Sequence, residues 1–435
     1  MHEAPEVHKF GGSCLRDRSD LERIAHIVHE ADRPVVLVVS ALWGTTDRLI
    51  RAANEPRYAG RLVSDLAKQH LRFAPNLLDS DLGDLFQGVL AGIEIALEGL
   101  ASDPNNVNFR NRLLAAGERL SALVVAHALQ EHGINASPFG AEDIGIKMCG
   151  TGHAVHVDVR ATKDAFDRKI LNGTPVITGW FGEGEDGELA LLSRGGSDHT
   201  ATALASLLDA NRVVLWKDVA GIFPINPRWG VTGQPIPYLG YGEAIEFAHL
   251  DAPILHPATV EPVYELGIPI EIRHLYHYKK SGLSTIIGPD ILGSIHPKGI
   301  ACVQKVALLI VQPHSHRDKA MSLGDAISRL QERQIQICSY EVTPRAWKFI
   351  VPQHDLRQAI QELNPYSIDM KYQYFSALLS IIGEVNSDDI SSLIHEFDQD
   401  AKEIHSTNHA THFLTQQNNI SMLLENLLGA FRIGI

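Results

Sequence analysis

Residues 1–290 alternate between strand-like and helix-like segments, and this alternation limits the fold more than any other feature. The β-branched run RPVVLVVSA at 33–41 is typical of a strand buried on both faces of a parallel sheet. Residues 61–132 have apolar side chains at helical spacing almost throughout. Strands that alternate with helices predict an α/β fold with a mostly parallel sheet sandwiched by helices.

The pattern changes after the Gly- and Pro-containing segment at 286–300, which is a plausible domain boundary. Residues 306–365 have the order strand, helix, two strands, helix, and the residues that follow repeat a similar order. Two tandem units of this kind predict paired ferredoxin-like βαββα domains, which often serve as ligand sensors.

Composition narrows the class of partner. The chain has 435 residues, which is enough for two or three domains. Its formal net charge of −14 argues against nucleic acid as a partner. Its four cysteines are far apart and form no CxxC pair. The N-terminus lacks a secretory pattern, and no apolar run approaches the roughly 18 to 20 residues of a membrane span. We therefore expect a cytoplasmic protein that acts on small metabolites, without a membrane.

Three histidines lie close together near the C-terminus, at His405, His409 and His412. Helical spacing would place imidazoles on one face, as a metal site requires. The threonines and the phenylalanine among them favour a strand instead, so we expect no metal site here.

Three glycine-containing breaks follow predicted strands, where ligands of doubly wound sheets bind. They are KFGGS at 9–13, SALWGTTD at 40–47 and SRGGSD at 193–198. In the third break, Ser197 or Asp198 can cap the following helix, whose N-terminus suits an anion such as phosphate. Each break taken alone is equally consistent with a simple turn, and neither a P-loop nor a dinucleotide motif occurs.

The helix containing GERLS at 117–121 adds a fourth motif, because Gly117 and Glu118 interrupt an otherwise apolar surface. A glycine inside a helix costs about 1 kcal/mol relative to alanine. Its presence indicates close packing or a ligand against that turn.

Together these motifs resemble those of the aspartate kinases of the amino acid kinase superfamily. The matching segments are KFGGSC, SALWGTT, GERLS, SRGGSD, KDVAGIFPINPR and LHPAT, and the resemblance covers essentially the whole chain. It implies an amino acid kinase catalytic domain at 1–290 and a first ACT domain at 306–365. It also implies a discontinuous second ACT domain, made of 299–305 and 370–435.

The resemblance implies transfer of the γ-phosphoryl group of ATP to the side-chain carboxylate of L-aspartate, with Mg²⁺ held chiefly by phosphate oxygens and water. The carboxylate is already ionised, so no general base is needed. The implied catalytic residues are Lys9 and Asp198. The implied substrate residues are Ser40, Thr46, Glu118, Arg194, Gly195, Gly196 and Ser197, with Arg194 on the α-carboxylate and Glu118 on the ammonium group. The implied nucleotide residues are Gly11, Gly12, Ser13, Lys217, Asp218, Phe223 and Arg228.

Several positions depart from the family pattern. Lys217 stands where threonine is usual, Asn226 where aspartate is usual, and Pro253 where the family has a lysine near the nucleotide phosphates. Our hypothesis is that Lys217 replaces that missing charge. Cys338 stands where lysine-inhibited relatives have an aspartate, which argues against lysine as an effector.

Three functions remain open at this point. They are an aspartate kinase, a kinase for another amino-acid carboxylate, and a catalytically weak amino-acid sensor that acts through its ACT domains. The resemblance further implies an amino-acid effector at the ACT domains, and ACT domains commonly pair, so we expect a homodimer.

Overall fold

The computed structural model describes most of the chain, namely residues 3–152, 155–193, 195–230, 233–250, 255–279, 283–291, 293, 296–313, 319–343, 345–384 and 387–431. The chain forms two compact units. The first contains Met1–Gly221 and Ala258–Pro289, and the second contains Ile222–Pro257 and Asp290–Ile435.

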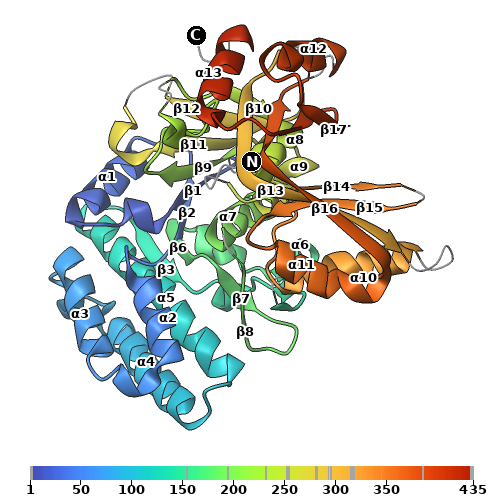
Figure 1. The fold of residues 1–435 in the computed structure, drawn as a ribbon. Helices are drawn as coiled ribbons and strands as arrows, with labels where there is room; N and C mark the ends of the chain where they lie inside the picture. The colour runs from blue at the N-terminus through green and yellow to red at the C-terminus, as the bar shows by residue number, and fades with distance from the viewer. Residues whose placement is uncertain are drawn as a thin grey trace. The chain divides into compact units, whose positions relative to one another are not determined.

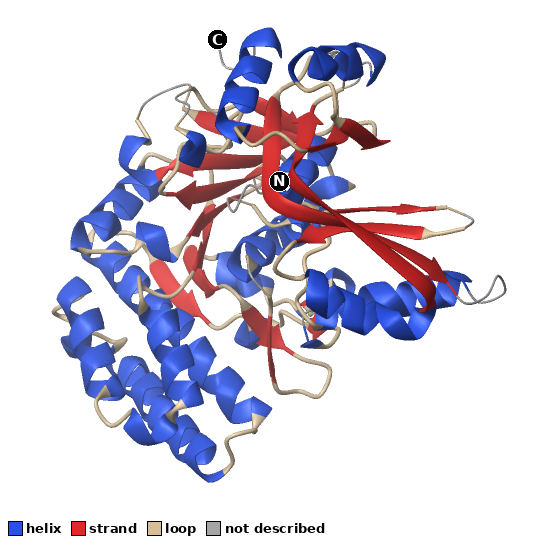
Figure 2. Ribbon diagram, viewed as in Figure 1, coloured by secondary structure: helices blue, strands red, loops and turns tan. Residues whose placement is uncertain are grey.

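The first unit is built on a mostly parallel sheet, which confirms the predicted α/β class (Figures 1 and 2). Its strands run in the order β12 (Ser284–Gly288), β11 (Ile270–His274), β9 (Arg212–Lys217), β1 (Glu6–Phe10), β2 (Val35–Val39), β6 (Thr174–Thr178) and β3 (Ala136–Phe139). Only the β11–β12 pair in this series is antiparallel. All five residues of β2 are buried, as its β-branched sequence predicts.

Helices cover both faces of this sheet (Figure 1). α1 (Arg18–His29) and α5 (Val107–Glu131) lie on one face, and α7 (Gly196–Leu208) lies on the other. Every residue of α7 except Ser206 is buried. The helical stretch predicted for residues 61–132 is confirmed. It consists of α3 (Leu62–Phe73), α4 (Gly83–Ser102) and α5, and α2 (Thr45–Asn54) packs beside them.

α4 has the length and composition of a membrane-crossing helix, with a mean hydropathy of 1.3 over an 18-residue window. The expectation that no apolar run approaches this length is therefore wrong by this measure, although Asp84, Glu94 and Glu98 divide the segment. Of the apolar window 22% is buried, and Phe86 and Ile93 are fully buried in the core of the first unit.

The strand before the third glycine break lies outside the main sheet. β8 (Leu189–Leu191) pairs only with β7 (Phe181–Glu183), in a separate two-stranded sheet. The chain leaves the main sheet after β6 through Trp180, which has a left-handed φ of 76°. The expectation that SRGGSD follows a strand of the main sheet is therefore wrong, although α7 still packs against β1.

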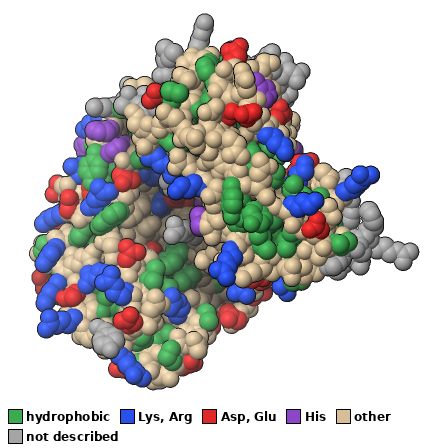
Figure 3. Space-filling view, viewed as in Figure 1, with side chains coloured by type: hydrophobic (Ala, Val, Ile, Leu, Met, Phe, Trp, Pro, Cys, Tyr) green, Lys and Arg blue, Asp and Glu red, His purple; other side chains and the backbone are tan. Residues whose placement is uncertain are grey.

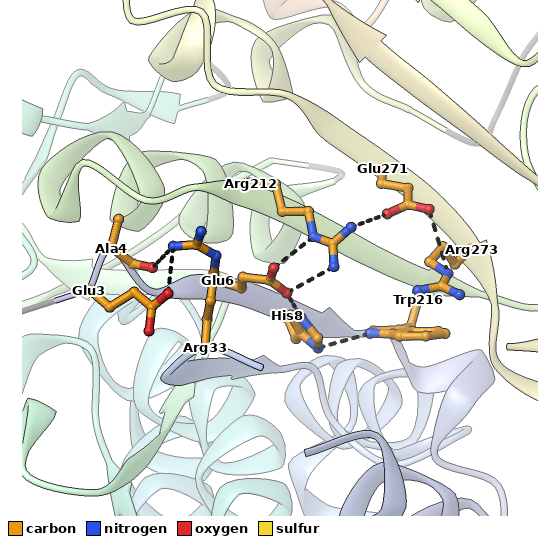
Figure 4. Close-up of polar contacts among 9 residues, drawn as sticks. All are labelled: Glu3, Ala4, Glu6, His8, Arg33, Arg212, Trp216, Glu271 and Arg273. Carbon is orange, nitrogen blue, oxygen red and sulfur yellow. Dashed lines mark hydrogen bonds and ion pairs between the residues drawn. The ribbon is translucent and has the colours of Figure 1, made fainter. Parts of the chain in front are cut away.

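A network of charged side chains crosses one face of β1, β9 and β11 (Figure 4). The Arg212 guanidinium lies 3.0 Å from Glu6 Oε1 and 3.0 Å from Glu271 Oε2, and Arg273 Nε lies 3.6 Å from Glu271 Oε1. Burial opposes ionisation of Glu6, but its contacts with His8 and Arg212 lower its pKa to about 2. Burial lowers the pKa of His8, which is therefore neutral. Two carboxylates thus balance two guanidinium groups and link three strands.

The second unit contains an antiparallel sheet. Its strands run in the order β14 (Ser339–Val342), β15 (Trp347–Pro352), β13 (Gly299–Pro313), β16 (Ser367–Ile382), β18 (Ala410–Thr415) and β17 (Lys402–Ser406). Its helices include α8 (Tyr241–Leu250), α10 (Lys319–Glu332), α11 (Leu356–Leu363), α12 (Ser387–Phe397) and α13 (Ile420–Phe431). The element order confirms the two tandem βαββα repeats.

Each repeat has its own core, although the long strands β13 and β16 run through both. Buried apolar side chains between positions 307 and 363 form the core of the first repeat. In the second repeat, Ile300 and Cys302 pack with buried apolar side chains between positions 377 and 428. The division falls at Lys305, which has a left-handed φ of 54° and is passed over in the pairing of β13 with β16. Residues 299–304 pair with the second half of β16, whereas residues 367–375 pair with the first repeat.

The segment 222–257 belongs to the second unit by its contacts, although the sequence places it in the domain 1–290. Ile225 lies in the second repeat's core, and Ile300 N donates to Pro224 O at 2.7 Å. β17 and β18 are strands at the histidine-rich segment, and the described residues include no group of three or more side chains that could hold a metal ion. None of the four cysteines, all of which lie in the described part of the chain, forms a disulfide bond.

Candidate active site

The two glycines at the start of α7 are required by the backbone conformation at one position and by close packing at the other. Gly195 is the N-cap and has a left-handed φ of 78°. A Cβ atom on Gly196 would lie 2.6 Å from Trp180 Cδ1. The expectation that Ser197 or Asp198 caps this helix is wrong, because no side chain caps it and the Asp198 carboxylate is drawn to two lysines.

Those two lysines hold Asp198 from neighbouring strands. Lys9 Nζ on β1 lies 2.7 Å from Asp198 Oδ1, and Lys217 Nζ on β9 lies 2.8 Å from Oδ2. Asp198 is 4% exposed and Lys9 is 7% exposed. Burial raises the pKa of Asp198, but the ammonium groups of Lys217 and Lys9 outweigh it and hold that pKa well below its usual range. The cluster has one positive charge in excess.

The first glycine break lies directly beside this cluster. A Cβ atom on Gly11 would lie 3.2 Å from Lys9 Nζ, and one on Gly12 would lie 3.1 Å from Ala41 O. The chain then turns through a short 3₁₀ helix, Gly12–Cys14, which contains Ser13. Glycine therefore leaves room next to the Lys9 ammonium, where a bulkier residue would crowd an approaching anion.

Glu118 on α5 is a buried acid with one unused oxygen. Its Oε1 accepts from Ala41 N at 3.2 Å, and Oε2 has no hydrogen-bond partner among the described residues. Burial raises its pKa to about 8, with the nearby charge of Lys9 acting in the opposite direction. A Cβ atom on Gly117 would lie 3.0 Å from Ala41 Cβ, so close packing accounts for that glycine. The open carboxyl oxygen suits a cationic guest.

The loop after β2 contributes hydroxyl groups to the same region. Ser40 Oγ donates to Ser197 Oγ at 3.0 Å, which links the end of β2 to α7. Thr45, which the sequence analysis did not select, is fully buried, and its hydroxyl has no partner within the part of the chain that the structure describes. Thr46, the predicted residue, is only half-buried. These adjacent threonines face different directions because of the rotation of α2 about its axis, which the sequence alone did not predict.

The remaining predicted residues belong to another contact of the first unit, to the second unit or to the part of the chain that is not described. Asp218 pairs with Arg16 at 3.0 Å on a partly exposed surface of the first unit. Phe223 and Arg228 belong to the second unit, where Arg228 Nη2 donates to Cys302 O at 3.4 Å. Asn226 Oδ1 accepts from Arg228 N at 3.1 Å and so caps a short 3₁₀ helix. Arg194 and Pro253 lie outside the described residues.

Residues 6–274 match the model of the amino acid kinase family, and this range includes Lys9, Glu118, Asp198 and Lys217. The chain belongs to that family. Its curated relatives include chloroplastic aspartokinase 3 of Arabidopsis thaliana, which is 27% identical over 406 residues, or 87% of this chain and 72% of the relative. The aspartokinase of Geobacillus stearothermophilus is 26% identical, over 87% of this chain and 83% of that protein.

Solved structures of aspartokinases have the same fold as this family member. E. coli aspartokinase III in complex with aspartate and ADP aligns with a TM-score of 0.80 and 21% identity, over 98% of this chain and 99% of that one. The aspartate kinase of Clostridium acetobutylicum aligns with a TM-score of 0.72 and 19% identity, over 99% of this chain and 100% of that one. At these identities the likeness establishes the fold, and the roles of individual residues remain predictions.

Proposed function

We propose that the chain is an aspartate kinase of amino-acid biosynthesis, which transfers the γ-phosphoryl group of ATP to the side-chain carboxylate of L-aspartate. The observation that carries this proposal is the Lys9–Asp198–Lys217 cluster, with its excess positive charge beside a glycine turn. The similarity to aspartokinases over most of the chain supports aspartate as the acceptor.

The cluster stabilises charge during transfer. Lys9 and Lys217 neutralise phosphoryl oxygens as the bond to the leaving group breaks, and Asp198 holds both ammonium groups in place before the nucleotide binds. Because these charges are already oriented, little reorganisation is needed in the transition state. Mg²⁺ would enter with the nucleotide phosphates and would supply further charge neutralisation.

Glu118 binds the α-ammonium group of the substrate through its open oxygen. Since burial raises its pKa to about 8, the Glu118 carboxyl group is mostly protonated at neutral pH before the substrate binds. A substrate ammonium group favours the ionised carboxylate, so binding releases a proton from Glu118. The Ala41 N–H group, which donates to Oε1, holds the carboxylate in position.

Trapping the product tests this function against its two alternatives. The protein is incubated with MgATP, hydroxylamine and either L-aspartate or L-glutamate, so that an acyl phosphate becomes a coloured hydroxamate. We expect a clear preference for aspartate and no product from a Lys9→Ala variant. Equal or greater yield with glutamate would indicate a kinase for another carboxylate. No yield with either amino acid would contradict the proposal and favour the sensor.

The second unit is proposed to bind an amino-acid effector. Lysine is bound with aspartate in a structure of E. coli aspartokinase III, whose fold this chain shares. In this chain Cys338 is 2% exposed, its backbone N donates to Ile350 O at 2.7 Å, and burial raises its thiol pKa to about 12. It offers no carboxylate to a lysine side chain. We therefore expect inhibition by an amino acid other than lysine, measured across the common amino acids.

We also propose a homodimer that forms along β16. Residues 367–375 of β16 pair with β13 on one side, whereas β18 joins β16 only from Ala377 onward. Ile368 and Tyr372 on this open edge are 65% and 54% exposed. An antiparallel pairing about Met370 would place Asp369 opposite the partner's Lys371. Open apolar edges with such complementarity favour strand pairing.

Charge reversal tests this dimer. We expect a dimer by sedimentation at micromolar concentration, a monomer for Asp369→Lys, and a restored dimer when Lys371→Asp is added. A wild-type monomer would contradict the proposal, and so would a dimer that survives Asp369→Lys alone.

A further inference from the structure

A groove of about 450 Å³ in the first unit takes no part in the mechanism above. It opens beside the loop between β2 and α2 and is lined by Trp43, Gly44, Arg48, Asp65, Lys68, Gln69 and Arg72. Three of these side chains are cationic and one is anionic, although the chain as a whole has a net charge of −14. Figure 3 shows Lys and Arg side chains among acidic ones over the helical part of this unit.

Two of the cations have no counter-ion. Lys68 and Arg72 are four residues apart on α3, so their side chains lie on the same helix face. Neither makes an ion pair with any residue that the structure describes. Arg48 differs, because its guanidinium donates to Gln69 Oε1 at 2.8 Å and lies 3.6 Å from Asp65 Oδ2. The groove therefore combines one oriented guanidinium group with two unpaired cations.

An aromatic ring completes the lining. Trp43 is 57% exposed, and the Arg16 guanidinium lies 4.8 Å from its ring centroid. Gln69 Nε2 donates to Trp43 O at 3.2 Å, which fixes the backbone under the ring. Cations beside an exposed indole suit an anion that carries phosphate, with or without a planar base.

We propose that this groove binds a small phosphate-bearing anion and that the bound anion tightens the binding of aspartate. The anion is either inorganic phosphate or pyrophosphate, or the phosphate of a nucleoside monophosphate. The coupling, but not the binding, rests on the function proposed above.

The coupling follows from the loop that the groove and the substrate site share. Trp43 N donates to Leu15 O at 3.0 Å, and two residues earlier Ala41 N donates to Glu118 Oε1 at 3.2 Å. An anion bound by Trp43 and Arg48 restricts the motion of this loop. It thereby holds in place the Glu118 carboxylate, which receives the substrate ammonium group. Because coupling is reciprocal, aspartate tightens anion binding by the same factor.

Calorimetric titration of the full chain with phosphate, pyrophosphate and AMP tests the binding. We expect the Lys68→Ala, Arg72→Ala double variant to bind at least ~10-fold more weakly than wild type. The matched control is Lys163→Ala, Arg168→Ala, which removes two exposed cations outside the groove. This control should bind within about twofold of wild type. Equal affinity of the groove variant and wild type would overturn the proposal, as would no binding of any probe at about 10 mM.

A Trp43→Ala variant identifies the source of the phosphate. Loss of AMP affinity with phosphate affinity retained assigns the groove to a nucleotide, and unchanged affinity for both assigns it to an inorganic anion. Titrating the preferred anion with and without saturating aspartate tests the coupling, for which we expect at least threefold tighter binding in the presence of aspartate. An unchanged or weaker affinity, in a protein that a direct titration shows to bind aspartate, would overturn the coupling. The anion titration requires neither aspartate nor phosphoryl transfer, so it succeeds or fails independently of the kinase assay.

Discussion

The strands β1 and β9 carry charged side chains on both faces, and the two faces differ in how those charges are matched. On one face Glu6 and Arg212 belong to a network in which carboxylates and guanidinium groups balance (Figure 4). On the other face, Lys9 and Lys217 share the single carboxylate of Asp198. Residues of the same strand therefore have different roles, because successive side chains of a strand point to opposite faces.

The difference identifies the functional face. A buried charge costs free energy unless it is paired, so the balanced network can exist for stability alone. The excess cation on the α7 face lacks such matching, and so do two groups beside the loop after β2, namely the open oxygen of Glu118 and the unpartnered hydroxyl of Thr45 within the described chain. They are accounted for when a substrate and a nucleotide supply the missing partners.

Removing Lys9 should have the largest effect on rate. We expect Lys9→Ala to lower kcat by roughly 10³-fold or more, since a single cation can contribute that much to phosphoryl transfer. Asp198→Asn should be similarly damaging, because it leaves two ammonium groups close together without a carboxylate between them. Steady-state hydroxamate assays measure both. Activity within about tenfold of wild type would remove either residue from the mechanism.

Removing Glu6, on the other face of the same strand, should affect stability and not rate. Glu6→Ala leaves Arg212 and His8 without their shared partner, and we expect a loss of roughly 3 kcal/mol in the free energy of unfolding. The folded pKa of Glu6 is depressed to about 2, so its stabilisation is present above about pH 4.5 and disappears as pH falls toward 2. Chemical denaturation at pH 7 and pH 3 measures this. A fall in kcat larger than about threefold would contradict the separation of the two faces.

Lys217 tests whether the second cation of the cluster is functional. Lys217→Thr should lower kcat at least ~10-fold, or about 1.4 kcal/mol of transition-state stabilisation, with a smaller effect on aspartate binding. The matched control is Lys163→Ala, an exposed lysine elsewhere in the same unit. An unchanged or faster Lys217 variant would show that Lys9 acts alone.

Replacing Glu118 by glutamine should give the smallest effect, a change in the unfolding temperature that depends on pH. The unfolded carboxyl ionises above about pH 4.5, whereas the folded one resists until about pH 8, so wild type loses stability between these values. Glu118→Gln lacks this loss and should unfold at a temperature a few degrees higher at pH 8, with no difference at pH 4. The KM for aspartate should fall as pH rises toward 8 in wild type only. Parallel pH profiles of the two proteins would exclude the raised pKa.

The sequence determined the element types, because periodicity and composition are local properties. The β-branched run at 33–41 gave β2, and the helical spacing at 61–132 gave α3 to α5. It also selected Lys9, Glu118 and Asp198 as a set, because their motifs resemble those of one family. The order of strand-like and helix-like segments likewise predicted the two C-terminal βαββα repeats.

The tertiary structure decided which groups meet. Lys9 and Lys217 are 208 positions apart in sequence, and only the parallel pairing of β1 with β9 makes them neighbours of Asp198. Asp198, which the sequence predicted as a helix cap, therefore lies at the centre of a charge cluster. The rotation of α2 about its axis buries the hydroxyl of Thr45 and not that of Thr46. Such contacts depend on strand register and helix rotation, which long-range packing sets and local sequence does not.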